Sequence, residues 1–287
     1  MRLFFELTLM FFIFSFLGWV MEVTLKYIQF HRFINRGFLI GPYCPIYGFG
    51  VVFITVVVGG LFGRKGSVIE VFFAGFVICG ALEYFTSWYM EKMFHARWWD
   101  YSQKPMNLHG RIWIGNLILF GLASVLIVYL LDPYYFKWMT YLSDTLLMVL
   151  GIFIIILYLT DTIVSHFLME IVRKNIDEAK GDNTETIAKE VHLMLKDKSI
   201  LIQRIEKAYP NFSARPKRIV NEIKMVRRKY HQLLKETTNA KKEFVKTHSD
   251  EIKNKISELN TKRKEVYQKL RNLEKSLLKK ENDEDDV

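Results

Sequence analysis

Apolar residues in the first 166 positions form five runs, each of a length suited to a membrane-spanning helix. A bilayer core about 30 Å thick requires roughly 20 apolar residues in helical conformation. The runs are Leu3 to Tyr27, about Pro45 to Phe62, Ser67 to Met90, Ile112 to Leu131 and Tyr141 to His166. This pattern predicts an all-α integral membrane protein with about five transmembrane helices, whose transmembrane domain comprises residues 1–166.

The start of the second run is rich in residues that interrupt helices. Six of the fourteen residues from Gly37 to Gly50 are glycine or proline, which a straight helix does not tolerate. The segment is also uncharged and aromatic, so we expect it to lie at or in the bilayer and to pack against protein. We therefore predict a re-entrant or otherwise irregular Gly-Pro segment before the second helix. The pattern leaves the exact path of residues 31–50 open.

Residues 167–287 show a different period, typical of soluble helices that pack through one apolar seam. Two series follow alternating spacings of three and four residues, apart from one gap of seven in each, and Arg263 occupies the skipped position of the second series. One series is Ile219, Ile223, Val226, Tyr230, Leu233, Ala240 and Phe244, and the other is Ile252, Ile256, Leu259, Val266, Leu270, Leu273 and Leu277. Ser249 before Asp250 favours a helix start. The pattern predicts an antiparallel, coiled-coil-like hairpin that turns near Thr247 to Ser249.

Two further features complete the predicted tail. A shorter helix is expected from about Thr184 to Tyr209, where Pro210 ends it. The acidic residues from Asn282 to Asp286 carry too much charge to pack, so this C-terminus is predicted to be disordered. Residues 167–287 are therefore predicted to form a helical tail with a disordered acidic end.

Charge separates the two parts of the chain and suggests an orientation. The net charge is +10, but the first 166 residues contain only 11 Lys and Arg against 9 Asp and Glu. Basic residues in short loops are retained on the cytoplasmic side of a membrane. If the tail is cytoplasmic, seven basic residues fall on the inner loops and four on the outer ones, which favours an outside N-terminus. The basic residues of the tail are interspersed with acidic ones and follow no nucleic-acid-binding fold, so we expect a solvated surface and no nucleic-acid partner.

Two long blocks of sequence resemble a known family. The first runs from Asn35 to Gly50, with Phe16 to Glu22 before it. The second contains Leu82 to Tyr84, Met90 to Phe94, Arg97 to Ser102, and Pro105 with Asn107 to Arg111. Both are similar to the bacterial CmpB-type membrane family described as "Putative ABC-transporter type IV". The resemblance covers about Phe11 to Leu131 and implies a multi-pass ABC transporter permease of the bacterial plasma membrane; the tail lies outside it.

Glu22 and Glu83 are the main candidate functional residues. A carboxylate within an apolar helix costs several kcal/mol unless it is paired or lines an aqueous path. Arg36 and Arg111 could pair with these carboxylates, and Asn35 and Asn107 could complete the hydrogen bonds. Two interpretations remain open. The residues are either polar locks between helices or part of a pathway for a proton, an ion or a solute.

The segment from Glu91 to Arg111 adds further polar and aromatic candidates. Trp98, Trp99 and Tyr101 are either anchors at the membrane interface or part of a binding site for a headgroup or solute. His95, His109 and Asp100 are spaced too widely to indicate a metal site. The predicted polar core therefore contains Glu22, Asn35, Arg36, Glu83, Glu91, Asp100, Asn107 and Arg111, with no metal and no cofactor.

The sequence contains no recognisable catalytic motif. The phosphate-binding pattern GxxxxGK[ST] is absent, as are GxSxG and HExxH, so we do not expect an enzyme or an ATPase. The leading hypothesis is a transport permease subunit in the lipid bilayer, which moves an unknown solute or ion with energy from a separate component such as an ATPase subunit. One alternative is a scaffold or regulator whose tail recruits cytoplasmic partners or a second copy. Another is a lipid-binding or lipid-modifying enzyme that uses Asp100.

Overall fold

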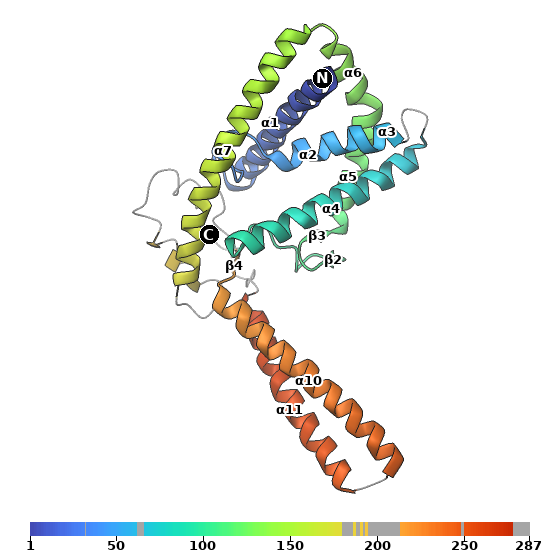
Figure 1. Ribbon diagram of the computed structural model, residues 1–287, viewed down its shortest axis with the longest axis vertical. Helices are drawn as coiled ribbons and strands as arrows, with labels where there is room; N and C mark the ends of the chain where they lie inside the picture. Colours follow the sequence, from blue (N-terminus) through green and yellow to red (C-terminus); the bar gives the residue numbers. More distant parts are fainter. Residues whose placement is uncertain are drawn as a thin grey trace. The chain divides into compact units, whose positions relative to one another are not determined.

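The computed structural model in Figure 1 describes most of the chain. The described residues are 1–31, 33–61, 66–179, 186–187, 190–191, 193–194, 213–247 and 250–277. They belong to two compact units. The membrane unit comprises Met1–Arg173 with Met194–Phe212, and the tail unit comprises Lys174–Leu193 with Ser213–Val287.

The membrane unit is helical, which confirms the predicted all-α membrane class. Among its described residues, four helices are long and apolar enough to cross a membrane. They are α1 (Arg2–Phe30), α4 (Val68–Phe94), the continuous run of α5 (Ile114–Leu126), η3 (Ile127–Leu131) and α6 (Asp132–Met139), and α7 (Asp144–Glu178). A shorter apolar helix, Pro45–Val58, consists of α2 (Pro45–Phe53) and the π-helical turn η1 (Ile54–Val58), and α3 (Gly59–Leu61) follows it.

Each predicted apolar run corresponds to one of these helices, but two helices extend further than expected. The fourth continues to Met139, with Pro133 placed directly after the π-helical turn η3. The fifth continues past His166 to Glu178, since helix propagation needs no apolar side chains. The predicted domain division after His166 therefore falls within α7.

Helices α1 and α2 pack against each other in opposite directions. The backbone amide of Cys44, just before α2, donates to the Ser15 carbonyl at 2.8 Å. Further along α2 and η1, the Thr55 hydroxyl lies 3.5 Å from the Met10 sulfur. The later residue of α2 and η1 thus contacts the earlier residue of α1. This order of contacts defines an antiparallel pair.

Helices α1 and α7 run in the same direction. Arg2 forms an ion pair with Asp144 at the start of both helices, and the rings of Phe11 and Tyr158 lie 5.1 Å apart further along. If the first and last of a series of crossing helices are parallel, the number of crossings is odd. This favours the short helix Pro45–Val58 as a crossing segment, although the total of five crossings stays a prediction.

Helices α4 and α5 approach closely because small residues face each other. A Cβ atom on Gly75 would overlap the Ser124 side chain, and one on Gly80 would lie 2.5 Å from Leu117. Such small residues allow the backbones of membrane helices to come together without a large side chain between them. The pairing places the end of α4 beside the start of α5, where the candidate site lies.

Apolar side chains fill the centre of the membrane unit and also cover its outside. The buried cluster draws on every long helix and includes Met10, Val58, Val71, Met139 and Leu147, each at 0% exposure. Outward-facing residues of the spans remain apolar, as a lipid-facing surface requires. Examples are Val77 at 64%, Leu119 at 62% and Phe153 at 61%.

The Gly-Pro segment is irregular only in its first part. Between α1 and α2, the described residues 33–44 form no helix, and Gly37 has a φ of 116°, which favours glycine. Pro45 occupies the first turn of α2. Gly48 and Gly50 lie within α2, so the irregular part is shorter than the predicted stretch from Gly37 to Gly50.

Short strands appear between α4 and α5. Strand β1 is Ala96–Arg97, and β2 (Asn107–Leu108) pairs antiparallel with β3 (Ile112–Trp113). Asn107 pairs with Trp113 in this hairpin. The loop between two spans is therefore an ordered element rather than a simple connection.

The tail unit contains short strand β4 (Ser213–Ala214) and helices α10 (Lys217–Thr247) and α11 (Asp250–Leu277). The two helices occupy the segments predicted for the hairpin, and Leu233, Ala240 and Leu259 form their buried contact. An ion pair between Lys269 and Glu222 (3.0 Å) joins them at the surface. Coiled-coil packing as such stays a prediction. The predicted helix from Thr184 to Tyr209 lies mostly outside the described residues, and the acidic C-terminus lies entirely outside them.

The contact between α1 and α2 generates a first prediction. A Cβ atom on Gly48 would lie 2.3 Å from the Phe11 carbonyl oxygen and 2.2 Å from the Ser15 hydroxyl oxygen. We expect Gly48→Ala to lower the free energy of unfolding by about 1–3 kcal/mol, the usual effect of overpacking. The measurement is thermal denaturation of the purified protein in detergent.

Gly60→Ala is the matched control, because no described atom lies within 4 Å of a Cβ built on Gly60. Alanine also favours a helix over glycine, so this variant should be as stable as the wild type or slightly more so. Equal denaturation midpoints for the two variants would contradict the close approach of α1 and α2.

Candidate functional site

Glu22 lies near the cytoplasmic end predicted for α1 and has a basic partner. Its Oε1 accepts a hydrogen bond of 2.6 Å from the Tyr47 hydroxyl of α2, and its Oε2 lies 3.6 Å from Arg36 Nε. Asn35 accepts a hydrogen bond of 2.8 Å from Trp19 Nε1 instead of contacting the carboxylate. The structure thus brings together Glu22 and Arg36, as the sequence suggested, and adds Tyr47.

Glu83 lies in α4 and is surrounded by neutral partners. The residue is only 7% exposed. Its Oε1 accepts hydrogen bonds from Asn116 Nδ2 at 3.1 Å and from the Tyr101 hydroxyl at 3.3 Å. Its Oε2 is buried and has no hydrogen-bond partner among the described residues. No ion pair to Glu83 is found in the part of the chain that the structure describes.

A short chain of hydrogen bonds fixes the groups around Glu83. Asn116 Nδ2 also donates to the Tyr101 hydroxyl at 2.8 Å, and Asn116 Oδ1 accepts from Trp113 Nε1 at 3.0 Å. Because the indole can only donate, this contact orients the amide so that its NH₂ group faces Glu83. The side chain that meets the carboxyl group therefore presents hydrogens, not an oxygen.

Tyr101 connects the two candidate acids electrostatically. Burial raises the pKa of its hydroxyl above the ordinary value, the negative charge of Glu83 raises it further, and that of Glu22 adds a smaller increase. Both carboxyl groups therefore act on the same tyrosine. Glu22 with Tyr47, and Glu83 with Tyr101 and Asn116, form two hydrogen-bonded groups, which we together call the carboxyl cluster.

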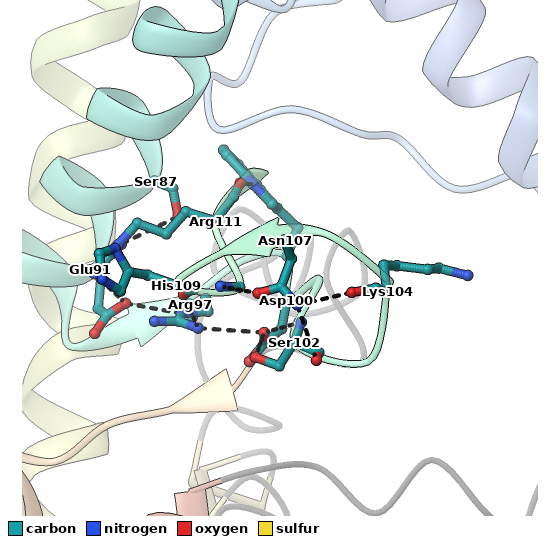
Figure 2. Close-up of polar contacts among 11 residues, drawn as sticks. Ser87, Glu91, Arg97, Asp100, Ser102, Lys104, Asn107, His109 and Arg111 are labelled. Atoms are coloured by element: carbon teal, nitrogen blue, oxygen red, sulfur yellow. Dashed lines mark hydrogen bonds and ion pairs between the residues drawn. The ribbon is translucent and has the colours of Figure 1, made fainter. Parts of the chain in front are cut away.

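Glu91 forms a second network with two buried arginines, shown in Figure 2. Its Oε2 lies 2.9 Å from Arg97 Nε and 3.0 Å from Arg111 Nη2. The side chains of Arg97 and Arg111 are only 7% and 10% exposed. Arg111 also donates to the Ser87 hydroxyl at 3.3 Å. Arg111 therefore pairs with Glu91, one helical turn beyond Ser87, and not with Glu83 as the sequence suggested.

Asp100 and Asn107 shape the loop that follows this network (Figure 2). Asp100 lies 3.3 Å from Arg97 Nη1 and accepts hydrogen bonds from the backbone and the hydroxyl of Ser102. Asn107 Oδ1 accepts from the backbone amide of Gly110 at 2.9 Å, and Gly110 has a φ of 65°. These residues form the turn geometry of the loop and make no contact with Glu83 that the structure shows.

Asp161 of α7 is a polar residue that the sequence analysis did not select. Its carboxylate accepts backbone hydrogen bonds from Ile40 at 2.9 Å and Gly41 at 2.7 Å, and one of 2.5 Å from the Tyr43 hydroxyl. Burial, followed by the contact with Asp161, raises the pKa of the Tyr43 hydroxyl. The same signal that selected Glu83, a carboxylate in an apolar run, could have identified Asp161.

Three other residues were also missed. Asn116 was overlooked because it carries no charge in an otherwise apolar run, and Tyr47 because it stands among other aromatic residues. Asp132 is 8% exposed and accepts a hydrogen bond of 2.9 Å from Thr55, where the two π-helical turns lie close to each other. Its position directly after the apolar run that ends at Leu131 was a usable signal.

Metal ligation finds no support in the described residues, which contain no group of three His, Cys, Asp or Glu side chains placed to hold an ion. His109 Nδ1 lies 3.0 Å from the Tyr84 hydroxyl, and Asp100 is engaged by Arg97 and Ser102.

A bundle of long apolar helices with buried carboxyl groups defines the class of a multi-pass membrane protein. A family model described as "Putative ABC-transporter type IV" matches residues 9–166, more than half of the 287 residues. The chain belongs to this family and is thus an ABC-transporter-related membrane protein. The match reaches further in both directions than the resemblance from Phe11 to Leu131. Neither the curated proteins nor the solved structures contain a match.

The network around Glu91 generates a second prediction. Glu91→Ala would leave Arg97 and Arg111 without the carboxylate that both of them contact. Removing one partner from a buried ion pair typically costs about 3–5 kcal/mol. We expect a correspondingly large drop in thermal stability in detergent. Glu170→Ala, which removes a half-buried neighbour of Arg173, should change stability by about 1 kcal/mol or less. Similar losses in the two variants would contradict the shared role of Glu91.

The contacts of Asp161 generate a third prediction, which uses Cys44 as a probe. Cys44 ends the irregular segment and is 7% exposed. We expect Asp161→Ala to release the segment and to speed maleimide labelling of Cys44 by about tenfold or more, because each lost hydrogen bond to a charged group contributes about 1.5–3 kcal/mol. Mass spectrometry measures the labelling rate at each cysteine.

Cys79 is the internal control for this experiment, because it is equally buried, at 8%, but lies in α4. Its labelling rate should not change. If both cysteines react faster, the variant has loosened the whole bundle. If neither does, Asp161 does not hold the segment.

Proposed function

We propose that the protein is a membrane subunit of a transport system, in which the carboxyl cluster lines the path of the transported solute or ion. Energy comes from a separate component, either an ATPase subunit or an ion gradient. The family description supports a relation to ABC transporters. The absence of a GxxxxGK[ST] motif from the full sequence supports a non-catalytic subunit that depends on another chain for ATP hydrolysis.

The state of Glu83 is the single observation that carries this proposal. A polar lock between membrane helices is stable when its charges are paired, as Glu91 is with two arginines. Glu83 is as deeply buried as those arginines, yet the described residues give it only an amide and a hydroxyl, on one oxygen. A buried carboxyl group with hydrogen-bond donors on only one oxygen costs free energy and does little to join the helices. The arrangement is expected of a group that binds a proton, an ion or a solute during transport.

Glu22 supports the same path from the other side of the cluster. Its side chain is 29% exposed and is paired with Arg36 and Tyr47. It is thus more open than Glu83 and closer to the segment that joins α1 to α2. In this proposal the path between Glu22 and Glu83 runs by Tyr101, whose hydroxyl donates to Glu83.

The proposal also includes a location and partners. We place the protein in the bacterial plasma membrane with the tail in the cytoplasm, as supported by the seven basic residues of the predicted inner loops. Helices α10 and α11 then offer a cytoplasmic surface to a second copy of the chain or to another subunit. Their exposed basic residues, such as Lys224 and Arg228, keep this surface soluble.

Glu83→Gln tests the proposal, since glutamine has nearly the same shape as glutamic acid but cannot ionise. A host strain that lacks the chain is complemented with the wild type, Glu83→Gln or the control Glu170→Gln. We expect the wild type and Glu170→Gln to restore the strain. Glu83→Gln should leave it at the level of the deletion, although the variant accumulates normally and keeps its thermal stability.

Two outcomes would contradict the transport proposal. Full complementation by Glu83→Gln would show that the carboxyl group is dispensable. Loss of accumulation and stability would instead show a structural lock. The energy source is tested by purifying the tagged full chain in mild detergent, where an ATPase subunit should remain bound to the wild type and to Glu83→Gln alike. Its repeated absence would argue for an ion gradient.

A further inference from the structure

The free oxygen of Glu83 points to the chemistry of the ligand that the site takes. Oε2 is buried and has no hydrogen-bond partner among the described residues, while Oε1 accepts two hydrogen bonds. An ionised carboxylate would spread its charge over both oxygens and leave one of them in an apolar environment without a donor. Neutralisation of the group is the usual response to such burial.

The groups that face Glu83 favour a proton over a metal ion as the neutralising species. A bound metal ion needs several oxygen ligands that present lone pairs. Asn116 presents its NH₂ group, because its oxygen is held by Trp113, and the Tyr101 hydroxyl directs its hydrogen to Oε1. Both partners therefore offer hydrogens to the carboxyl group. A proton on Oε2 needs no additional ligands and fits this arrangement.

The charged and titratable groups around Glu83 agree with a neutral acid. From α4 itself, Cys79 lies one helical turn before Glu83, and its thiol is buried and forms no disulfide. From α1, Glu22 contributes a negative charge, and from α2, Tyr47 is engaged with Glu22. Arg111, which contacts Ser87 one helical turn beyond Glu83, pairs with Glu91. A second negative charge on Glu83 would be repelled by Glu22 without a cation to offset it.

We infer that Glu83 is a proton-binding group, which holds a proton on Oε2, whereas Glu22 is paired with Arg36. This inference rests on the proposed function and deepens it, because it names the proton as the ion that the carboxyl cluster takes. The cluster also contains the hydroxyls of Tyr101 and Tyr47, one beside each acid.

Infrared spectroscopy of the purified full chain in detergent at neutral pH tests this inference directly. A protonated carboxylic acid gives a carbonyl-stretch band that an ionised carboxylate lacks. We expect the band in the wild type, in Glu22→Gln and in the control Glu170→Gln, and its loss in Glu83→Gln. The band should also shift when the protein is transferred to D₂O, if the proton exchanges. A wild-type spectrum with no band that Glu83→Gln removes would overturn the inference.

Glu83→Asp guards against a variant that does not fold. It keeps an acid in α4 and should retain the band at a shifted frequency, and its fold is checked by the thermal midpoint. The inference would also be overturned if the folded Glu83→Asp protein lost the carbonyl-stretch band while Glu83→Gln kept it at wild-type intensity.

The infrared spectrum tests the proton-binding assignment, and the complementation experiment tests the transport proposal. Either of these two claims can fail without the other. If the band belongs to Glu83 but Glu83→Gln complements the deletion strain, the transport proposal is wrong and the proton-binding assignment stands. If Glu83→Gln abolishes complementation and no such band exists, the assignment is wrong and the transport proposal stands.

Discussion

The free-energy cost of an ionised carboxylate among apolar helices governs the polar contacts of the membrane unit. Such a group must have a cation, a set of donors or a proton. Glu6 has the side chain of Arg2, at 2.8 Å. Asp161 has two backbone amides and two hydroxyls. Glu22 has Arg36 and a tyrosine. Among the described carboxyl groups, only Glu83 has a buried oxygen without a hydrogen-bond partner, and this difference separates the proposed site from the structural contacts.

The positions of the acids depend on how closely the helices approach. Gly18 of α1 leaves room for the ring of Tyr47, since a Cβ at Gly18 would lie 2.4 Å from that ring. The same ring carries the hydroxyl that contacts Glu22. On the other side of the bundle, small residues between α4 and α5 bring Asn116 to Glu83. The positions of the polar side chains therefore depend on the apolar packing, because glycines allow the helices to approach closely enough for these side chains to meet.

The loop between α4 and α5 supplies the remaining part of the cluster. Glu91 and two arginines fix its start, Asp100 and Asn107 fix its turns, and β2 and β3 return the chain to the membrane. As a result, Tyr101 is held where its hydroxyl reaches Glu83. The residues that sequence reasoning grouped as one polar core thus form two networks. One shapes the loop and the other contains the candidate acids.

The sequence by itself determined the class of the protein, because the lengths of apolar runs reflect the thickness of a bilayer and need no knowledge of neighbours. It located the helices, the irregular Gly-Pro segment and the seam of the tail, and it selected Glu22 and Glu83 through the cost of burying a charge. Only the tertiary structure decided which groups surround each acid. Arg111 pairs with Glu91 instead of Glu83, and an uncharged asparagine takes the position beside Glu83. Pairing depends on the distance between side chains from different helices, and local periodicity contains no information on that distance.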